Sequence, residues 1–320
     1  MHIDPRLFLP EAIDASTRAA NEMLEKLLAS VPATNTQQPA QLRAARDAGT
    51  STLPAPVKLA HAETRAIRGP AGELKLRIFR NNSARGVYLH IHGGGWTLGA
   101  ADQQDVMLDA IARAARAAVV SVEYRLAPEH PYPAGPDDCE AAALWLIENA
   151  SREFGASALA IGGESAGAHL SAVTLLRLRD KHGASPFRAA NLVYGCYDLG
   201  FTPSVRRWGA RNLVLSTPII EWFTNHFAPD RAGRSDPDLS PLNADLRCMP
   251  PALFSVGTLD PLLDDTIFMA QRWLAAANRA ELAIYPGGVH GFNLFPMPLG
   301  AAALRRSETF LAEAFSGDPK

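Results

Sequence analysis

The sequence predicts an α/β fold with a mostly parallel central sheet and helices on both of its faces. Between residues 86 and 290, short apolar runs alternate with segments compatible with helices. Most of the runs are continuously apolar, as expected for parallel strands that are covered on both faces. They are GVYLHIH (86–92), AAVVSVEY (117–124), ALAIGG (158–163), NLVYG (191–195), ALFSVG (252–257) and ELAIYPG (281–287). Repeated strand–helix units favour right-handed crossovers, with functional groups at the carboxyl ends of the strands.

The segments around these runs fit the same architecture. LKLRIFR (74–80) alternates apolar and polar residues, which predicts an antiparallel strand where the sheet starts. Pro136, Asp137 and Asp138 open a stretch with helical periodicity, and acidic residues are favourable at the positive end of a helix. We therefore expect a helix after the second of the parallel strands.

Two regions interrupt the alternation and are predicted to form a cap over the strand ends. Residues 10–30 place apolar residues near one helical face, and 31–56 has the composition of a linker and loop. In the second region, Thr217 and Pro218 suit an N-cap and a first helical position. We expect a cap segment and linker over 1–50, a first core part over 51–197, a cap insertion over 198–235, and a second core part over 236–320.

Composition and charge indicate which partners and which cell compartment to expect for this protein. The chain has 320 residues and a formal net charge of -2, which gives no reason to expect a nucleic acid or an anionic membrane as partner. No window approaches the roughly 18 to 20 apolar residues that span a bilayer. Three cysteines without a C-x-x-C pair, and an N-terminus unlike a signal peptide, predict a cytoplasmic protein with no stable membrane association.

The segment GGESAGAHL (162–170) holds a serine between two glycines, after a predicted strand and before a predicted helix. A sharp strand–helix turn projects the serine hydroxyl out of the sheet and leaves little room for side chains at Gly163 and Gly167. The helix N-terminus behind it favours developing negative charge. Ser165 is therefore the candidate nucleophile.

A serine nucleophile needs a base to remove its proton and a third group to orient that base. Asp260 and His290 each follow a predicted strand, in the order nucleophile, acid, histidine that this strand-end arrangement favours. Asp264 and Asp265 are rivals for the acid, one helical turn further on. His169, His182 and His226 also follow the serine, but none of them has the strand-end context.

The segment HIHGGGW (90–96) predicts backbone donors for an oxyanion. Three glycines after a strand can turn their N–H groups toward a ligand, so Gly94, Gly95 and the N–H of Ala166 form the candidate oxyanion hole. His90 and His92 share a strand face, but no further ligand lies at useful spacing, so neither a metal nor an organic cofactor is expected. Glu164, beside the serine, is expected to orient the turn or to pair locally.

Five motifs in order resemble the bacterial hormone-sensitive lipase family of α/β-hydrolases over roughly residues 60–315. They are HGGGW (92–96), YRLAPEHPYPA (124–134), GESAG (163–167), LDPLLDD (259–265) and HGF (290–292). The resemblance implies the α/β-hydrolase fold with a helical cap, and hydrolysis of small carboxylic esters with short acyl chains through Ser165, Asp260 and His290. Glu164 departs from the common form of the motif, which has aspartate before the serine.

The motifs leave other activities open. An amide, formamide or lactone hydrolase would use the same triad, and a non-catalytic ligand-binding module could reuse the same fold. Exposed strand edges in such folds make a homodimer possible. The cap is also expected to supply apolar residues either to a substrate pocket or to its own packing against the core: Phe8, Trp208, Leu213, Leu215, Trp222, Phe223 and Phe227.

Overall fold

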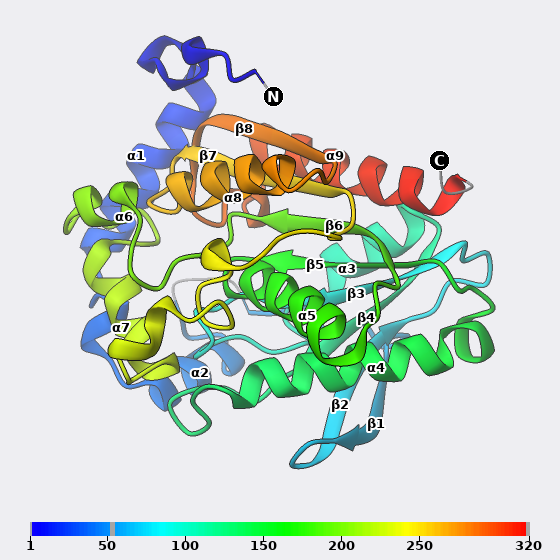
Figure 1. The fold of residues 1–320 in the computed structure, drawn as a ribbon. Coiled ribbons are helices and arrows are strands. Elements are labelled where there is room, and N and C mark those ends of the chain that lie inside the picture. The colour runs from blue at the N-terminus through cyan, green and yellow to red at the C-terminus, as the bar shows by residue number, and fades with distance from the viewer. Residues whose placement is uncertain (1, 52–54, 318–320) are drawn as a thin grey trace.

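The computed structural model describes residues 2–51 and 55–317, and their strands form one eight-stranded sheet in the order β1-β2-β4-β3-β5-β6-β7-β8 (Figure 1). Strands β1 (Glu63–Gly69) and β2 (Gly72–Phe79) form an antiparallel hairpin, and β2 also pairs antiparallel with β4. The other pairings are parallel and join β3 (Gly86–Ile91), β4 (Ala117–Glu123), β5 (Leu159–Glu164), β6 (Phe187–Val193), β7 (Ala252–Leu259) and β8 (Ala280–Val289). The predicted α/β fold class is confirmed.

The burial of each strand follows from its sequence pattern. Every residue of β3 and of β5 is buried, which matches their continuous apolar character. In β2, by contrast, buried Leu74 and Leu76 flank exposed Lys75. Strand β1 was not predicted from the sequence. Ile67 is its one buried residue, and a half-exposed edge strand carries little apolar signal.

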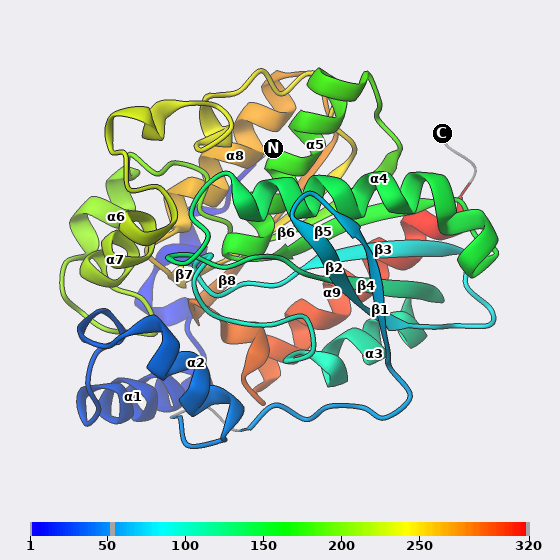
Figure 2. The ribbon, with the colours of Figure 1, turned by 90° about the horizontal axis from the view of Figure 1, so that it is seen from below.

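Helices cover both faces of the sheet (Figures 1 and 2). Helices α4 (Ala134–Phe154), α5 (Ala166–His182) and α8 (Leu263–Ala275) contribute to the larger apolar core on one face. Helices α3 (Asp105–Ala114) and α9 (Pro298–Ser316) pack their apolar residues into a second core on the other face. These two cores make the sheet a rigid platform for the loops at its carboxyl edge.

The remaining helices gather at one side of the molecule, beyond the strand ends (Figures 1 and 2). They are α1 (Ala15–Ala29), α2 (Pro39–Asp47), α6 (Pro203–Trp208) and α7 (Thr217–Phe227). The Asn21 side chain of α1 donates to the carbonyl of Gly287 at 2.8 Å, and Arg211 pairs with Glu25 at 2.9 Å. The first cap region and the insertion thus contact each other, although the exact domain boundaries remain predictions.

Two local expectations for the cap were wrong. Residues 31–56 were expected to be loop, but α2 forms there, with Pro39 in its first turn and alanines that favour helix despite a weak apolar pattern. Positions 52–54 of this stretch lie outside the described residues. The N-cap of α7 is Ser216 rather than Thr217, because the Ser216 hydroxyl accepts a hydrogen bond from the N–H of Ile219.

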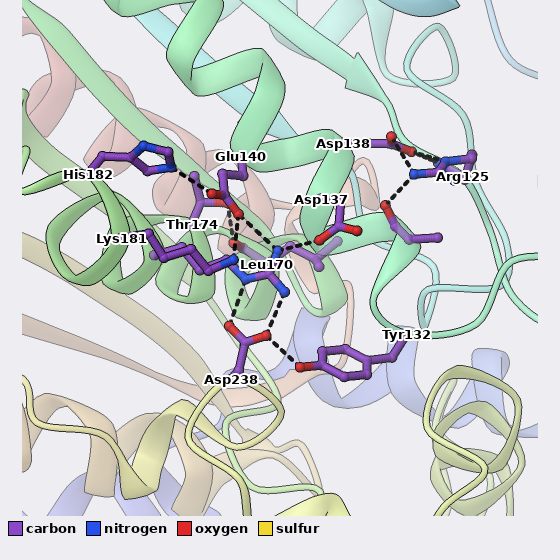
Figure 3. A network of polar contacts seen from close by, with 12 residues as sticks. Arg125, Tyr132, Asp137, Asp138, Glu140, Leu170, Thr174, Lys181, His182 and Asp238 are labelled. Atoms are coloured by element: carbon purple, nitrogen blue, oxygen red, sulfur yellow. Dashed lines mark hydrogen bonds and ion pairs between the residues drawn. The ribbon is translucent and has the colours of Figure 1, made fainter. Parts of the chain in front are cut away.

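A buried arginine fixes α5 against its surroundings. Arg177 pairs with Asp238 at 2.5 Å, with Asp137 at 2.8 Å and with Glu140 at 3.0 Å, and its side chain is only 4% exposed. Asp137 and Glu140 come from α4 and Asp238 from another segment (Figure 3), and the hydroxyl of Tyr132 donates to Asp238 at 2.7 Å. The network joins α4, α5 and the segment that follows the cap insertion.

No helix within the described part of the chain is long and apolar enough to cross a membrane. The three cysteines are free, with Cys139 and Cys196 buried and Cys248 exposed.

Candidate active site

Ser165 lies on the sharp turn between β5 and α5, directly after the last residue of the strand. Its backbone has φ 56° and ψ -118°, a strained conformation for a residue with a side chain. A Cβ atom at Gly163 or Gly167 would lie 1.9 Å from the carbonyl oxygen of Ile91, so only glycine fits at either position. The Ser165 N–H donates to the carbonyl of Val193 at 2.9 Å, which holds the turn against β6.

His290 links Ser165 to Asp260. Its Nε2 lies 2.9 Å from Ser165 Oγ, and its Nδ1 lies 2.9 Å from Asp260 Oδ2. Asp260 directly follows β7 and His290 directly follows β8, and both side chains are more than nine-tenths buried. With Nδ1–H donating to the carboxylate, Nε2 accepts from the serine hydroxyl, which is the tautomer that a general base needs.

The rival residues bond elsewhere. Asp264 accepts from the N–H of Ser204 at 2.8 Å, and His182 contacts Glu140 at 2.7 Å. His169 lies between the Trp96 indole N–H at 3.1 Å and the Leu239 carbonyl at 2.9 Å. The remaining two rivals, Asp265 and His226, contact the start of the cap insertion and Trp222, respectively.

The glycine loop after β3 borders the same cavity as Ser165 and His290. Gly94 has φ 116° and Gly95 has φ 58°, which are conformations that favour glycine. A Cβ atom at Gly94 would lie 2.2 Å from the carbonyl oxygen of Leu98, so the loop closes tightly on itself there. Ala166 is the first residue of α5. That these three residues donate their N–H groups to an oxyanion remains a prediction.

His92 supports this loop from within. Its Nδ1 lies 2.8 Å from the carbonyl oxygen of Gly93, and its ring stacks on Tyr124 with centroids 4.2 Å apart. Burial lowers the pKa of His92 to about 4, so the imidazole is neutral near pH 7. The Tyr124 hydroxyl donates to the carbonyl of His92 at 2.9 Å. The YRLAPEHPYPA segment, which starts at this tyrosine, thus contacts the glycine loop.

The cavity beside Ser165 has a volume of about 360 Å³. Its apolar wall includes Val214, Leu215, Ile220, Phe223, Leu262 and Leu294, and the N-terminal region adds Leu42, Arg43 and Arg46. Of the seven apolar residues expected from the cap, Leu215 and Phe223 line the cavity. Phe227 instead stacks on Trp96, with centroids 4.7 Å apart. The cap therefore provides both the cavity wall and its own packing.

Tyr194 is a site residue that was not predicted from the sequence. Its ring lies 4.6 Å from the His290 ring between centroids, and its hydroxyl donates to the side-chain oxygen of Asn293. Burial raises the pKa of Tyr194 well above its ordinary value, so the hydroxyl stays protonated. The signal that points to it is its position near the end of the NLVYG run, directly after β6 ends at Val193, because functional groups gather at the carboxyl ends of parallel strands.

Within the described residues, no group of three or more histidine, cysteine, aspartate or glutamate side chains is placed to hold a metal ion. His90 and His92, which share a strand face, bond to separate partners. His90 contacts Ser121 and Glu164 within the core, whereas His92 contacts its own loop.

The raised pKa of the buried Asp265 carboxyl group predicts that the stability of the protein depends on pH. Burial raises its pKa from 3.8 to about 7, despite hydrogen bonds from Thr202 and from the N–H groups of Tyr197 and Asp198. The folded protein therefore holds a proton that the unfolded chain releases, so this contribution favours folding at low pH and is lost between about pH 4 and 7. We expect the free energy of unfolding of the wild type, relative to Asp265→Asn, to fall across this range.

Urea unfolding of both proteins at several pH values checks this expectation. Asparagine keeps an acceptor oxygen but does not titrate, so the difference between the proteins isolates the carboxyl group. A difference that stays constant or grows with pH would contradict the assignment.

The chain is similar to known α/β-hydrolases. A family model described as the alpha/beta hydrolase fold matches residues 88–294. The carboxylic ester hydrolase LipN of Mycobacterium tuberculosis is 40% identical over 251 residues, which are 74% of this chain and 66% of LipN. The carboxylesterase NlhH of the same organism is 39% identical over 222 residues, or 68% of this chain and 69% of NlhH. The aligned segment thus spans about two thirds of each relative.

Solved structures extend the similarity to nearly the whole chain. A thermostable esterase from Pseudomonas putida superposes with a TM-score of 0.85 at 26% identity, covering 96% of this chain and 98% of the other. A hyperthermophilic esterase from Pyrobaculum calidifontis superposes with a TM-score of 0.83 at 27% identity, covering 92% and 97%.

Proposed function

Because this chain belongs to the α/β-hydrolase family, in its hormone-sensitive lipase-like branch, we propose that it is a serine carboxylesterase acting on small esters with short acyl chains. The observation that carries the proposal is the position of His290, within hydrogen-bond distance of both Ser165 and Asp260. The curated relatives with esterase names support the same reaction class.

In the proposed mechanism, His290 takes the proton of Ser165 as the hydroxyl oxygen attacks the ester carbonyl. Asp260 orients the imidazole and stabilises its charged form. The N–H groups of Gly94, Gly95 and Ala166 hold the oxyanion. As the tetrahedral intermediate collapses, the C–O bond to the alcohol breaks and His290 protonates the departing oxygen. The same imidazole then activates water, which releases the acid and restores Ser165.

Initial rates on p-nitrophenyl esters from acetate to laurate test this function. We expect turnover of the short esters, and labelling of Ser165 by a fluorophosphonate at one equivalent per chain, read from the mass of the peptide that carries it. Folded protein that hydrolyses none of these esters would overturn the proposal. Matched p-nitroanilides, formamides and lactones then distinguish the other hydrolytic activities that use the same triad.

The preference for short acyl chains is proposed because the cavity is small and Phe223 forms part of its wall. In Phe223→Ala the cavity gains room, so we expect the ratio of kcat/KM for octanoate over acetate to rise about tenfold. Trp222→Ala is the matched control, since Trp222 precedes it on the same helix and does not line the cavity. An equal rise in both variants, or none in Phe223→Ala, would contradict the assignment.

A further inference from the structure

A row of polar side chains crosses three neighbouring strands beneath the proposed active site. The Ser121 hydroxyl of β4 donates to His90 Nδ1 at 3.0 Å, and His90 Nε2 on β3 donates to Glu164 Oε2 on β5 at 3.0 Å. Ser121 and His90 are fully buried, and Glu164 is 5% exposed. None of the three takes part in the proposed reaction. Buried polar groups are nearly always hydrogen-bonded, as these three are to one another.

The His90–Glu164 bond joins the two segments that carry the proposed oxyanion donors. Glu164 directly precedes Ser165 and Ala166, whereas His90 lies four positions before Gly94. These segments also touch further on, since a Cβ atom at Gly93 would lie 2.8 Å from the carbonyl oxygen of Glu164. The side-chain bond therefore fixes the relative placement of the two segments at their base.

The bond depends on the length of the glutamate. In the parallel register, His90 lies opposite Gly162, so Glu164 reaches diagonally back across two positions. An aspartate would be shorter by one C–C bond, about 1.5 Å, and would leave His90 Nε2 beyond hydrogen-bond distance. Glutamate beside the nucleophile and histidine at position 90 are thus matched to each other.

Resting on the esterase function proposed above, we propose that His90 and Glu164 are positioning residues for the oxyanion hole. They hold the strained turn at Ser165, and hence the N–H of Ala166, at a fixed spacing from Gly94 and Gly95. Strained backbone persists only where its surroundings restrain it. Since the oxyanion forms only in the transition state, loosening this spacing lowers kcat and leaves KM unchanged.

Two substitutions at one position separate reach from charge. Glu164→Gln keeps the length and an oxygen that accepts from His90 Nε2, whereas Glu164→Asp keeps the charge and loses the reach. With p-nitrophenyl acetate we expect Glu164→Asp to lose about tenfold to a hundredfold in kcat, with KM within about twofold. Glu164→Gln should retain kcat within about threefold, because its amide oxygen still accepts from His90 Nε2. A threefold change in kcat is a small change in the activation free energy compared with the tenfold or greater loss expected for Glu164→Asp.

Ser307→Ala controls for lost stability. It removes the buried hydrogen bond that the Ser307 hydroxyl of α9 donates to Asn191 Oδ1 of β6 at 3.2 Å, outside the proposed site. Circular dichroism and thermal unfolding are measured for each variant. His90→Asn breaks the same link from β3 and replaces Glu164→Asp if that variant does not fold. The inhibition constant of phenylboronic acid, which forms a tetrahedral adduct with a serine nucleophile, should rise in parallel with the loss of kcat.

The outcomes distinguish this inference from the function on which it rests. Wild type that hydrolyses no ester overturns the function. Active wild type together with a folded Glu164→Asp or His90→Asn of unchanged kcat overturns only the positioning role. An equal loss of kcat in Glu164→Gln and Glu164→Asp also overturns it, because Glu164→Gln keeps the reach and the acceptor oxygen on which the link depends. A loss confined to Glu164→Gln overturns it as well, because the charge rather than the link would then be responsible.

Discussion

Ser165→Ala is expected to lower kcat/KM for p-nitrophenyl acetate by about 10³-fold to 10⁶-fold. The substitution removes the only oxygen within hydrogen-bond distance of His290 Nε2 among the described contacts, so no acyl-enzyme can form there. The cavity and the proposed backbone donors remain, and we expect them to account for any residual rate above that of water. Initial rates at matched folding, verified by circular dichroism, measure the effect.

The same substitution at buried Ser307 is the control, since it removes a hydroxyl from α9 without touching the cavity. Fluorophosphonate labelling should persist in Ser307→Ala and disappear in Ser165→Ala. If Ser165→Ala retained more than about a tenth of the wild-type rate, nucleophilic catalysis by this serine would be excluded.

Arg177→Met is expected to lower the free energy of unfolding by about 3 kcal/mol, at the lower end for a broken buried ion pair. The guanidinium makes two hydrogen bonds to Asp238 and one each to Asp137 and Glu140. Methionine fills much of the volume but leaves three carboxylates close together without their shared cation. These carboxylates are partly exposed, so water relieves some of the cost.

Urea unfolding measures the loss, with Arg306→Met as the matched control. Arg306 pairs with Glu281 at 2.6 Å, but both side chains are about half exposed, so we expect that variant to lose less than about 1 kcal/mol. Equal losses in the two variants would contradict the importance of the buried network. Because α5 begins immediately after Ser165, we also expect Arg177→Met to inactivate at a lower temperature than wild type.

The elements of the fold that could be predicted are those whose pattern of apolar residues lies within the element itself. The parallel strands were predicted because burial on both faces requires continuous apolar runs, which are visible in the sequence itself. Strand β1 and helix α2 were missed, because one edge strand is largely exposed and the helix has little apolar periodicity. For both, the contacts with the rest of the chain decide the structure more than local pattern does.

The candidate site likewise has residues that local sequence predicts and contacts that depend on the folded chain. The apolar runs in the sequence are enough to predict that Ser165, Asp260 and His290 follow strands. They therefore meet at one sheet edge, since parallel strands align their carboxyl ends. The packing of Tyr194 on His290 and the contact of Glu164 with His90, by contrast, are visible only in the folded chain. Such contacts depend on strand order and register, which bring residues 90 and 164 together across a distance that no local sequence pattern records.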